Sequence, residues 1–390
     1  MQRIMKYIFA SCAFGATLFL GGCSGGSPVA AGPTPERITF AGIGAHGIFD
    51  PSIARDPATG RLWMSYSAVD PSPTWPANGN VVSTHLAYSD DNGMTWTVSG
   101  SGELINDYAD VMLPLASPND GTWVNEVSQL IYDPNAVTGE EWKILWHHYL
   151  NIHNVRHFEH GWIAMKAAGT PEGLATATEI KLFGGYLYDS ANDTPAPTGT
   201  TQSPVGGAPL IQLDTALNTE LNNCLFSEPG MYATNSALYV SLLCAKYPAT
   251  DHLIALFKCT GSCTTGGGWS YLGTAFNNAD AAAFGYDTGF SASGMFESGG
   301  NVYLVATPVQ TSGAPWPDYY SGCRVFQFSN IDAATLQGSP PMLVGSVDGA
   351  AGSFNGACAY HASANMSGML YSEFNTSTLT FQIYKSHIDF

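Results

Sequence analysis

The stretch that decides the fold runs from Gly47 to Ser67 and reads GIFDPSIARDPATGRLWMSYS. Its apolar beginning and its alternating end are each typical of a β-strand. The segment Asp56 to Gly60 between them has the Asp, Pro and Gly residues of a tight turn. An acidic residue, Asp50, lies at the beginning of the first strand. The stretch therefore predicts an antiparallel strand pair with an acid at its open end.

The same order of strand, turn, strand, loop and strand occurs five times along the chain. The first strands of the five units are predicted at 50–54, 126–132, 228–233, 291–296 and 360–364. Abundant Gly and aromatic residues with few Lys and Glu indicate an all-β protein, and repetition of a small antiparallel unit is typical of a propeller. We therefore predict a five-bladed β-propeller over residues 37–390, with 37–41 closing the last blade and 169–223 as an insertion.

The amino-terminal segment has the pattern of an export signal. Over residues 1–23, two basic residues precede an apolar run, and small residues precede Cys23. This ending resembles the lipobox of bacterial lipoproteins, which implies a lipid on Cys23. Residues 24–36 are predicted to be a flexible tether. We expect an exported lipoprotein of the bacterial cell envelope, whose membrane contact is the lipid alone; an ordinary signal peptide with a chance cysteine is the alternative.

The charge of the chain limits its partners. The formal net charge is −18, and it becomes −20 when the two basic residues of the signal are removed. So acidic a chain repels nucleic acid and anionic membrane surfaces. It is also a poor binder of polyanionic polysaccharide in the absence of a local basic patch. We therefore expect neither nucleic acid nor a polyanionic polysaccharide as a partner.

Six cysteines follow the signal, and an even number in an exported protein predicts disulfides. Cys259 and Cys263 are close enough in sequence for a local bridge across a turn. The blade topology makes two other pairs plausible, although sequence alone does not fix the connectivity. No cysteine and histidine spacing typical of a structural zinc site is present. The disulfide candidates are Cys224, Cys244, Cys259, Cys263, Cys323 and Cys358.

One local motif supports the propeller. Residues 89–96, SDDNGMTW, match the Asp-box pattern S-x-D-x-G-x-T-W. In such a hairpin Ser89 and Asp91 bond turn amides, Gly93 adopts positive φ and Trp96 packs between sheets. The motif is structural and occurs in sialidases and in many other propellers. A sialidase is a minor alternative, because the chain lacks an Arg-Ile-Pro segment and has five arginines after the signal.

Three carboxylates are expected to converge at one mouth of the central channel. In antiparallel blades, the start of the first strand and the loop after the second strand lie at the same end. Asp50, Glu126 and Glu228 therefore meet there, and three costly buried carboxylates at one rim indicate a functional site rather than packing. The substrate-binding candidates around them are Trp75, His148, His153, Trp316, Tyr320 and His361.

Five of the ten histidines lie between positions 147 and 160. The spacing of His153, His157 and His160 would suit a metal site. The segment is not an evident helix, however, so the spacing does not place three rings on one face. Substrate contact, metal binding and plain packing stay open for this loop, and we assign no metal ligand.

The three acids resemble those of five-bladed propeller glycoside hydrolases, above all the arabinanases and xylosidases of family 43. Phe49-Asp50-Pro51 and Ser227-Glu228-Pro229-Gly230 carry the resemblance. It implies that Asp50 is the general base, that Glu228 is the general acid, and that Glu126 tunes and orients that acid. It also implies a fifth-blade histidine, matched by His361, near a channel that can hold a structural calcium ion; no cofactor is required. Glu126 departs from the family, which has aspartate there.

The predicted activity is hydrolysis of glycosidic bonds in a neutral polysaccharide or oligosaccharide, with pentose-containing polymers among the candidates. Two carboxyls separated by about 6.5–9.5 Å leave room for a water and predict inversion. The expected protein is a monomer whose partner is its carbohydrate substrate. The main alternative is a non-catalytic, carbohydrate-binding or surface-interaction propeller. A polysaccharide lyase using His and Tyr is a further one.

Overall fold

The computed structural model describes residues 35–39, 44–71, 80–105, 110–111, 121–152, 155–185, 187–189, 194–196, 209–247, 251–310, 320–348, 354–362 and 368–390. The chain divides into two units, Met1–Thr34 and Pro35–Phe390. All described residues belong to the second unit. Among them, no helix has the length and apolar character that crossing a membrane requires.

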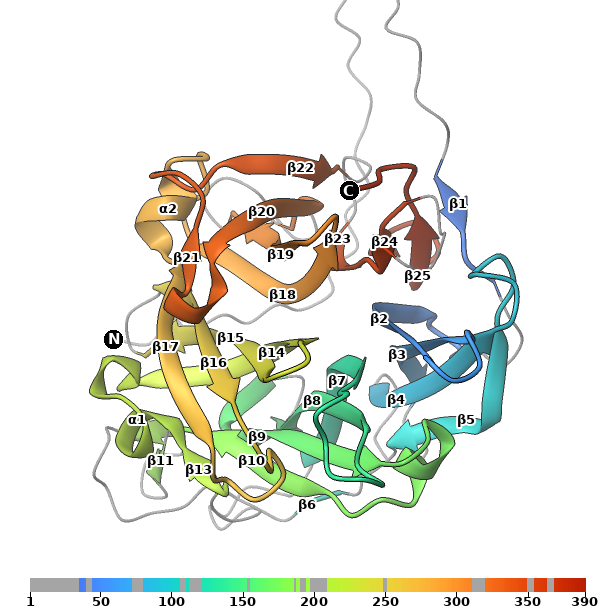
Figure 1. Ribbon diagram of the computed structural model, residues 1–390, viewed down its shortest axis with the longest axis horizontal. Helices are drawn as coiled ribbons and strands as arrows, with labels where there is room; N and C mark the ends of the chain where they lie inside the picture. Colours follow the sequence, from blue (N-terminus) through green and yellow to red (C-terminus); the bar gives the residue numbers. More distant parts are fainter. Residues whose placement is uncertain are drawn as a thin grey trace, which may run out of the picture. The chain divides into compact units, whose positions relative to one another are not determined.

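Five sheets surround a common centre (Figure 1), and each places one strand innermost. The innermost strands are β2 (Ile48–Arg55), β7 (Gly121–Tyr132), β14 (Cys224–Ala233), β18 (Gly289–Ser298) and β23 (Phe354–Ala359). Each of these strands contacts the next one, and β23 contacts β2, so the ring is closed. The prediction of an all-β, five-bladed β-propeller is confirmed.

The remaining strands extend each blade outward from its innermost strand. Blade one continues with β3 (Leu62–Pro71), β4 (Asn80–Ser89) and β5 (Thr97–Ile105). Blade two continues with β8 (Trp142–Ile152), β9 (Val155–Ala168), β10 (Ile180–Gly184) and β13 (Ile211–Gln212), and β6 (Asp110–Val111) pairs with the other side of β7. Blade three continues with β15 (Leu238–Lys246), β16 (His252–Cys259) and β17 (Trp269–Phe276).

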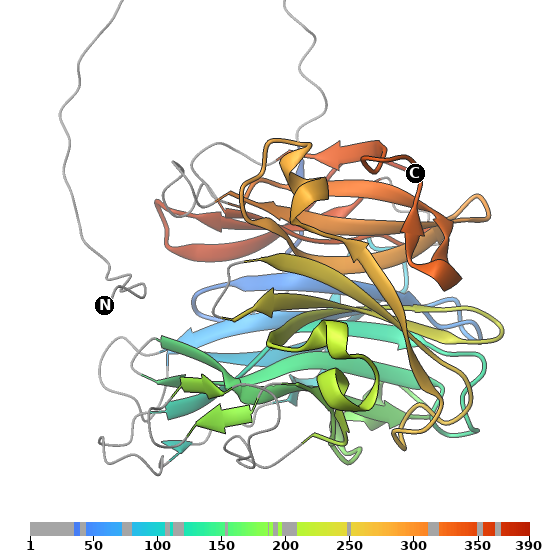
Figure 2. The ribbon, with the colours of Figure 1, turned by 90° about the vertical axis from the view of Figure 1, so that its left-hand side faces the viewer.

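The last two blades differ in how their outer edge is built. In blade four, β19 (Asn301–Val309) and β20 (Cys323–Asn330) follow β18, and both β21 (Thr335–Leu336) and β22 (Leu343–Val347) pair with β20. In blade five, β24 (Leu370–Asn375) and β25 (Thr380–Lys385) follow β23, and β1 (Glu36–Arg37) forms the outer edge. Figure 2 shows the longer strands of these two blades, coloured orange to red, running across the view.

Few helices accompany the strands. The α-helices are α1 (Leu213–Ala216) and α2 (Asn278–Ala282), and the 3₁₀-helices are η1 (Glu172–Ala175), η2 (Thr219–Leu221) and η3 (Ile331–Ala333). A separate hairpin is formed by β11 (Leu187–Asp189) and β12 (Thr194–Ala196). Helix α2 begins with a capping box between Asn277 and Asp280, which satisfies amides that a short helix otherwise leaves unpaired.

The amino-terminal end of the second unit closes the ring, as predicted, although with a shorter strand. Glu36 and Arg37 pair with Lys385 and Tyr384 of β25, and the Lys385 ammonium lies 2.8 Å from a Glu36 carboxylate oxygen. The predicted insertion at 169–223 proves to contain β10, the strand that pairs with β9 in blade two. Part of the presumed insertion therefore belongs to the blade itself.

Aromatic side chains fill the spaces between blades. Between blades one and two, Trp63 and Trp146 are almost completely buried in one apolar cluster. Between blades three and four, Phe276, Phe290 and Phe326 pack at centroid distances of 4.4–5.6 Å. Burying side chains of this size contributes about 2–3 kcal/mol each. The blades are thus held against one another largely by aromatic packing.

The Ser89–Trp96 turn joins β4 to β5 through its own side chains. Asp91 Oδ1 accepts from the Ser89 hydroxyl at 2.7 Å and from the Thr95 amide at 2.8 Å. The Ser89 Oγ accepts from the Gly93 amide at 2.8 Å, and Gly93 has φ +84°. The hydrogen bonds from Thr95 lower the pKa of Asp91 to about 2. The turn is therefore closed by an ionised carboxylate.

The six candidate cysteines form three disulfides. The pairs are Cys224–Cys244, Cys259–Cys263 and Cys323–Cys358. The first two lie within blade three, whereas the third joins β20 of blade four to β23 of blade five. All three expected pairings are confirmed.

Candidate active site

A β-bulge interrupts every innermost strand of the propeller. The ladder registers shift between Phe49 and Ser52, Glu126 and Gln129, Ser227 and Gly230, Ser291 and Gly294, and Gly356 and Ala359. Each bulge contains one non-glycine residue with φ between 45° and 53°: Asp50, Val127, Glu228, Ala292 and Ala357. These five positions are structurally equivalent, and two of them carry a carboxylate.

The bulge conformation is unfavourable for residues with a side chain, at about 1–2 kcal/mol each. It also leaves residues out of the ladder between the innermost and second strands. Pro51 and Pro229 follow the two acids directly, and proline, which has no amide hydrogen, suits an unpaired bulge position. The sequences Asp50-Pro51 and Glu228-Pro229 thus fit the backbone on which they lie.

The two carboxylates bind the bulge of the following blade. The Val127 amide of blade two donates to Asp50 Oδ2 at 3.2 Å. The Ala292 amide of blade four donates to Glu228 Oε2 at 2.5 Å. Both acids are therefore oriented along the ring, each from its own bulge toward the next.

Glu126 approaches the same region from the residue before the blade-two bulge. Its side chain is buried, and Glu126 Oε1 accepts a hydrogen bond of 2.7 Å from the Tyr149 hydroxyl. Burial raises the pKa of Tyr149 well above its usual value. The phenol therefore stays protonated and acts as the hydrogen-bond donor. Tyr149 was not predicted from sequence. Its position on β8, two residues after His147, was the only signal available.

The three carboxyls influence one another electrostatically. Burial raises the pKa of Asp50 well above its usual range, and the nearby charges of Glu126 and Glu228 raise it further. Burial likewise raises the pKa of Glu228, with a further contribution from Glu126. Because each negative charge disfavours the next, the cluster retains protons at a pH where isolated carboxyls have lost them.

The hydrogen bonds of the two acids differ in strength. The short bond from Ala292 and the positive charge of Arg156 both favour ionised Glu228. Asp50 receives longer bonds, 3.2 Å from the Ser67 hydroxyl and 3.2 Å from the Val127 amide. In both acids these hydrogen bonds oppose the effect of burial, which raises the pKa of each carboxyl.

Arg156 supplies the positive charge near the acids. It lies on β9 and is exposed. Its charge partly offsets the effect of burial, which raises the pKa of Glu228 and Tyr149, and it adds to the effect of burial, which lowers the pKa of His147. Sequence reasoning considered the histidines of this loop and passed over the arginine between them. The signal that could have found it was the scarcity of arginine in so acidic a chain.

The structure places His148 within the core of blade two. Its ring stacks on Trp123 at 4.5 Å and lies 4.6 Å from Trp162, and 1% of the residue is exposed. Nδ1 lies 2.5 Å from Asn125 Oδ1, and burial lowers the pKa of His148 to about 3. In this position the imidazole is neutral and enclosed, which favours packing over the substrate contact that was predicted.

His361 lies at a different level of the channel from the one predicted. The prediction aligned residues 360–361 with Asp50, whereas the bulge of blade five aligns Ala357 with Asp50. Beyond the bulge the strand runs away from the acids, and the charge of Arg55, at the far end of β2, lowers the pKa of His361. Burial is the larger cause, and the pKa falls to about 4. The placement of His361 beside the acids is therefore corrected.

Tyr320 lies where the prediction put it, at the bulge end of blade four. It bridges to Val309, the last residue of β19, and Val309 pairs with Gly289 at the beginning of β18. The other substrate-binding candidates, Trp75, His153 and Trp316, and the lipidation candidate Cys23, lie outside the described residues.

Comparisons with known proteins identify the fold. No protein-family model matches the chain, and no curated protein matches it in sequence. The GH32 β-fructofuranosidase BmSUC1 of Bombyx mori has a TM-score of 0.50 and 9% identity, over 90% of this chain and 61% of that chain. This chain thus spans about three fifths of the length of that enzyme.

Two further solved structures align with this chain over most of its length and over most of their own. Zg3597, a family 117 glycoside hydrolase of Zobellia galactanivorans, has a TM-score of 0.48 and 11% identity over 92% of each chain. The endo-arabinase of Bacteroides thetaiotaomicron has a TM-score of 0.46 and 10% identity, over 87% of this chain and 94% of that chain. At these identities the likeness concerns the fold alone, which is shared with propeller glycoside hydrolases.

Proposed function

We propose that the chain is a glycoside hydrolase that cleaves a neutral carbohydrate at the cluster formed by Asp50, Glu126 and Glu228. One observation carries the proposal: two of five equivalent bulges bear a carboxylate, and their charges are coupled. The fold does not need an acid there, because Ala292 and Ala357 occupy the same position in blades four and five. Asp50 is buried and Glu228 is partly buried, and carboxylates held away from solvent beyond the needs of folding are expected at sites that do chemistry.

The proposed reaction is a single displacement with inversion. One carboxylate removes a proton from water, the water oxygen attacks the anomeric carbon, and the other carboxyl gives its proton to the departing sugar oxygen. The two carboxyls then exchange their proton with solvent, so that each returns to its starting state. Glu126, held by Tyr149, positions and tunes the acid through its charge.

The roles of Asp50 and Glu228 can be assigned experimentally. The family resemblance makes Asp50 the base and Glu228 the acid, and burial raises the pKa of both carboxyls. An aryl glycoside with a good leaving group needs little help from an acid, so a variant without its acid retains activity on it. Retained activity in Glu228→Ala and not in Asp50→Ala supports the family assignment; the opposite result reverses it.

The activity itself is tested by sugar release from a panel of neutral polysaccharides and oligosaccharides. We expect release by the wild-type protein and an Asp90→Asn control, an exposed acid paired with Arg61. Asp50→Asn and Glu228→Gln should retain the fold by circular dichroism and lose release. Full activity in either variant would refute the proposed site.

A non-catalytic carbohydrate-binding propeller is the second candidate. It is favoured by the structural bonds that both acids make to bulge amides, since those bonds alone could explain the two carboxylates. For such a protein, affinity for a glycan would survive in Asp50→Asn and Glu228→Gln, and no member of the panel would be cleaved by the wild type. Calorimetric titration with the oligosaccharides of the same panel separates the two candidates.

The export and anchoring of the chain are a separate part of the proposal. They rest on the basic start, the apolar run and Cys23 in the sequence. Incorporation of a labelled fatty acid into the wild type and not into Cys23→Ser would support them. Absence of label from the wild-type protein in a lipoprotein-processing host would contradict them.

A further inference from the structure

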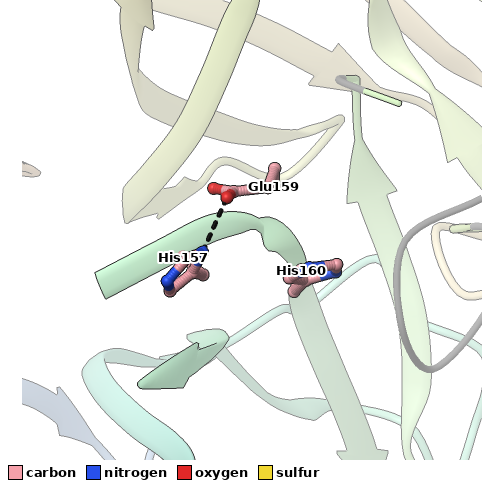
Figure 3. A group of neighbouring side chains, drawn as sticks. All are labelled: His157, Glu159 and His160. Carbon is pink, nitrogen blue, oxygen red and sulfur yellow. Dashed lines mark hydrogen bonds and ion pairs between the residues drawn. The ribbon is translucent and has the colours of Figure 1, made fainter. Parts of the chain in front are cut away.

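We propose that His157, Glu159 and His160 form a site for a divalent transition metal, with zinc as the ion that the donors favour. Each of the three residues offers one ligand atom, and these atoms all lie within 4.8 Å of one another. Figure 3 shows the three side chains gathered at a bend of β9. The site is separate from the acidic cluster and does not depend on the proposed hydrolase activity.

An irregularity in β9 brings the three residues together. In a regular strand, His157 and His160 would point to opposite faces of the sheet. Here His157 pairs with Leu150 and Gly161 pairs with the adjacent Tyr149, so residues 158–160 bulge out of the ladder. The bulge removes the alternation of side chains and places both imidazoles near the same carboxylate.

Gly161 is the residue that permits this bulge. A Cβ atom at this position would lie 2.6 Å from the His148 carbonyl oxygen and 2.8 Å from the Tyr149 Cβ. Contacts as short as these would force the backbone to move. Only glycine therefore allows the strand to return to β8 directly after the bulge. The arrangement is therefore specified by the sequence rather than produced by a flexible loop.

The environment of the three residues suits an ion. Glu159 is 6% exposed and His160 is fully buried, whereas His157 is only partly buried. His157 Nδ1 lies 2.8 Å from Glu159 Oε1, which shows the carboxylate directed at an imidazole that reaches toward solvent. A buried carboxylate needs a cationic partner, and a metal entering beside His157 would supply one.

The donor types decide which ion fits. Two imidazole nitrogens and one carboxylate oxygen are the ligands of many zinc sites, which leave a fourth position for water. Calcium and magnesium prefer sites made of oxygen donors alone. The six cysteines that follow the signal are all in disulfides, so no thiolate competes for the ion.

A metal here would also act on the acidic cluster. Phe158, the first residue of the bulge, packs with its ring centroid 4.8 Å from those of both His147 and Tyr149. The Tyr149 hydroxyl in turn donates a hydrogen bond to Glu126. By fixing the residues on either side of Phe158, the ion would hold Tyr149, and through it Glu126, in one position.

The proposal is tested by zinc binding to tag-free protein after treatment with a chelator. Equilibrium dialysis should find one zinc per wild-type chain, and cobalt in its place should give the visible absorption of a four-coordinate ion. His157→Ala and Glu159→Gln should weaken binding by at least about 100-fold, while His387→Ala, which removes an exposed histidine, should leave binding unchanged.

Thermal unfolding provides a second readout that does not depend on activity. Zinc should raise the midpoint of the wild type and of His387→Ala, and should leave that of His157→Ala unchanged. His160 is fully buried, so its alanine variant could misfold; the partly exposed His157 and the isosteric Glu159→Gln decide the outcome. No zinc bound by the wild type, or equal binding in all folded variants, overturns the proposal.

Discussion

Blades one and three share a strained bulge with blades four and five, but they fill it differently. Asp50 and Glu228 occupy the position in the first pair, and Ala292 and Ala357 occupy it in the second, at nearly the same φ. The backbone of the propeller therefore imposes the bulge, and the side chain at that point is free to vary. The bulge side chains, which differ between blades, are therefore the positions at which the propeller can carry chemical groups without changing its backbone.

The comparison extends to the group that binds each bulge amide. The Ala357 amide donates to the Thr307 hydroxyl at 2.9 Å, and the Asp50 amide donates to the Ser372 hydroxyl at 2.8 Å. Both hydroxyls lie at the same position of the second strand of the preceding blade. A hydroxyl is thus sufficient to join one bulge to the previous blade.

The carboxylate blades depart from this pattern in two ways. Blade one has both groups, since the Val127 amide lies 3.2 Å from the Ser67 hydroxyl and 3.2 Å from Asp50. In blade three the corresponding position of the second strand is Leu243, and Glu228 binds the amide. The Asp50 carboxylate is therefore not required to bind the Val127 amide, because the Ser67 hydroxyl is also within reach. The Glu228 carboxylate, by contrast, takes the place of the hydroxyl that blade three lacks at Leu243.

The largest effect should come from removing the carboxylates without removing their shape. Asp50→Asn and Glu228→Gln should each lower the rate of sugar release by about 1000-fold, because an amide neither takes up nor releases the catalytic proton. Matched changes at the alanine bulges, Ala292→Ser and Ala357→Ser, should alter the rate by less than about threefold. Comparable losses in all four variants would show that the bulge geometry, rather than the acids, supports activity.

The next effect concerns the disulfide that fixes an alanine bulge. Cys358 follows Ala357 and is bonded to Cys323 across 35 residues. Replacing both cysteines by serine should lower the free energy of unfolding by about 4 kcal/mol, because the cross-link restricts a long loop in the unfolded chain. The Cys259–Cys263 bridge closes 4 residues, and its removal should cost about 2 kcal/mol. Denaturant unfolding of both double variants measures the difference.

A smaller effect should separate the two carboxylates. Glu228→Ala leaves the Ala292 amide without its acceptor and should cost about 1–2 kcal/mol of stability, while Glu228→Gln keeps an oxygen and should cost less. Asp50→Ala should cost less than Glu228→Ala, because Ser67 remains near the Val127 amide.

A double-mutant cycle with Leu243→Thr checks the reason. A threonine there would restore the hydroxyl that blade four has at Thr307, so the loss in Glu228→Ala should be partly recovered in that background. The catalytic rate should not recover. If the effects of the two changes on stability were additive, a hydroxyl at position 243 would not substitute for Glu228 in binding the Ala292 amide.

The smallest effect is on the pH dependence of stability. The folded pKa of Asp50 is raised above its unfolded value of about 3.9. The folded state thus binds this proton more strongly, and wild-type stability falls as the pH rises from about 4 through the folded pKa. Asp50→Asn lacks this loss, so its stability relative to wild type should rise between pH 4 and pH 7.

Thermal unfolding of Asp50→Asn and wild type across that pH range measures the gain, and Asp90→Asn, at an exposed acid, is the control. An equal difference in stability at both ends of the range would mean that the Asp50 carboxyl titrates alike in the folded and unfolded states.

Local patterns in the sequence were enough to predict the ring. The alternation of apolar residues from Leu62 to Ser67 and the turn at Asp56–Gly60 both describe interactions between near neighbours, which sequence encodes directly. The all-β class, the five units and the closing strand followed from such patterns and from the topology they imply. Disulfides were expected from the even number of cysteines, but their connectivity was left open and was fixed only by the structure. The acids Asp50, Glu126 and Glu228 could be selected because each begins or precedes a predicted strand at the same end of its blade.

Only the tertiary structure decided which groups surround those acids. The bulge shifts the register by a few residues, so that Ala357 rather than Tyr360 or His361 aligns with Asp50. The direction of His148 depends on Trp123 and Trp162, which lie on strands on either side of it.

The same holds for the pairings that the sequence did not indicate. Tyr149 reaches Glu126 only because β8 pairs with β7, and the bulge at 158–160 gathers His157, Glu159 and His160 against the alternation of a strand. Sequence determined the strands and the acids because both depend on local chemistry. Proton affinity, ring orientation and shared ligands depend on groups far apart in the chain, so they were settled only when the blades packed together.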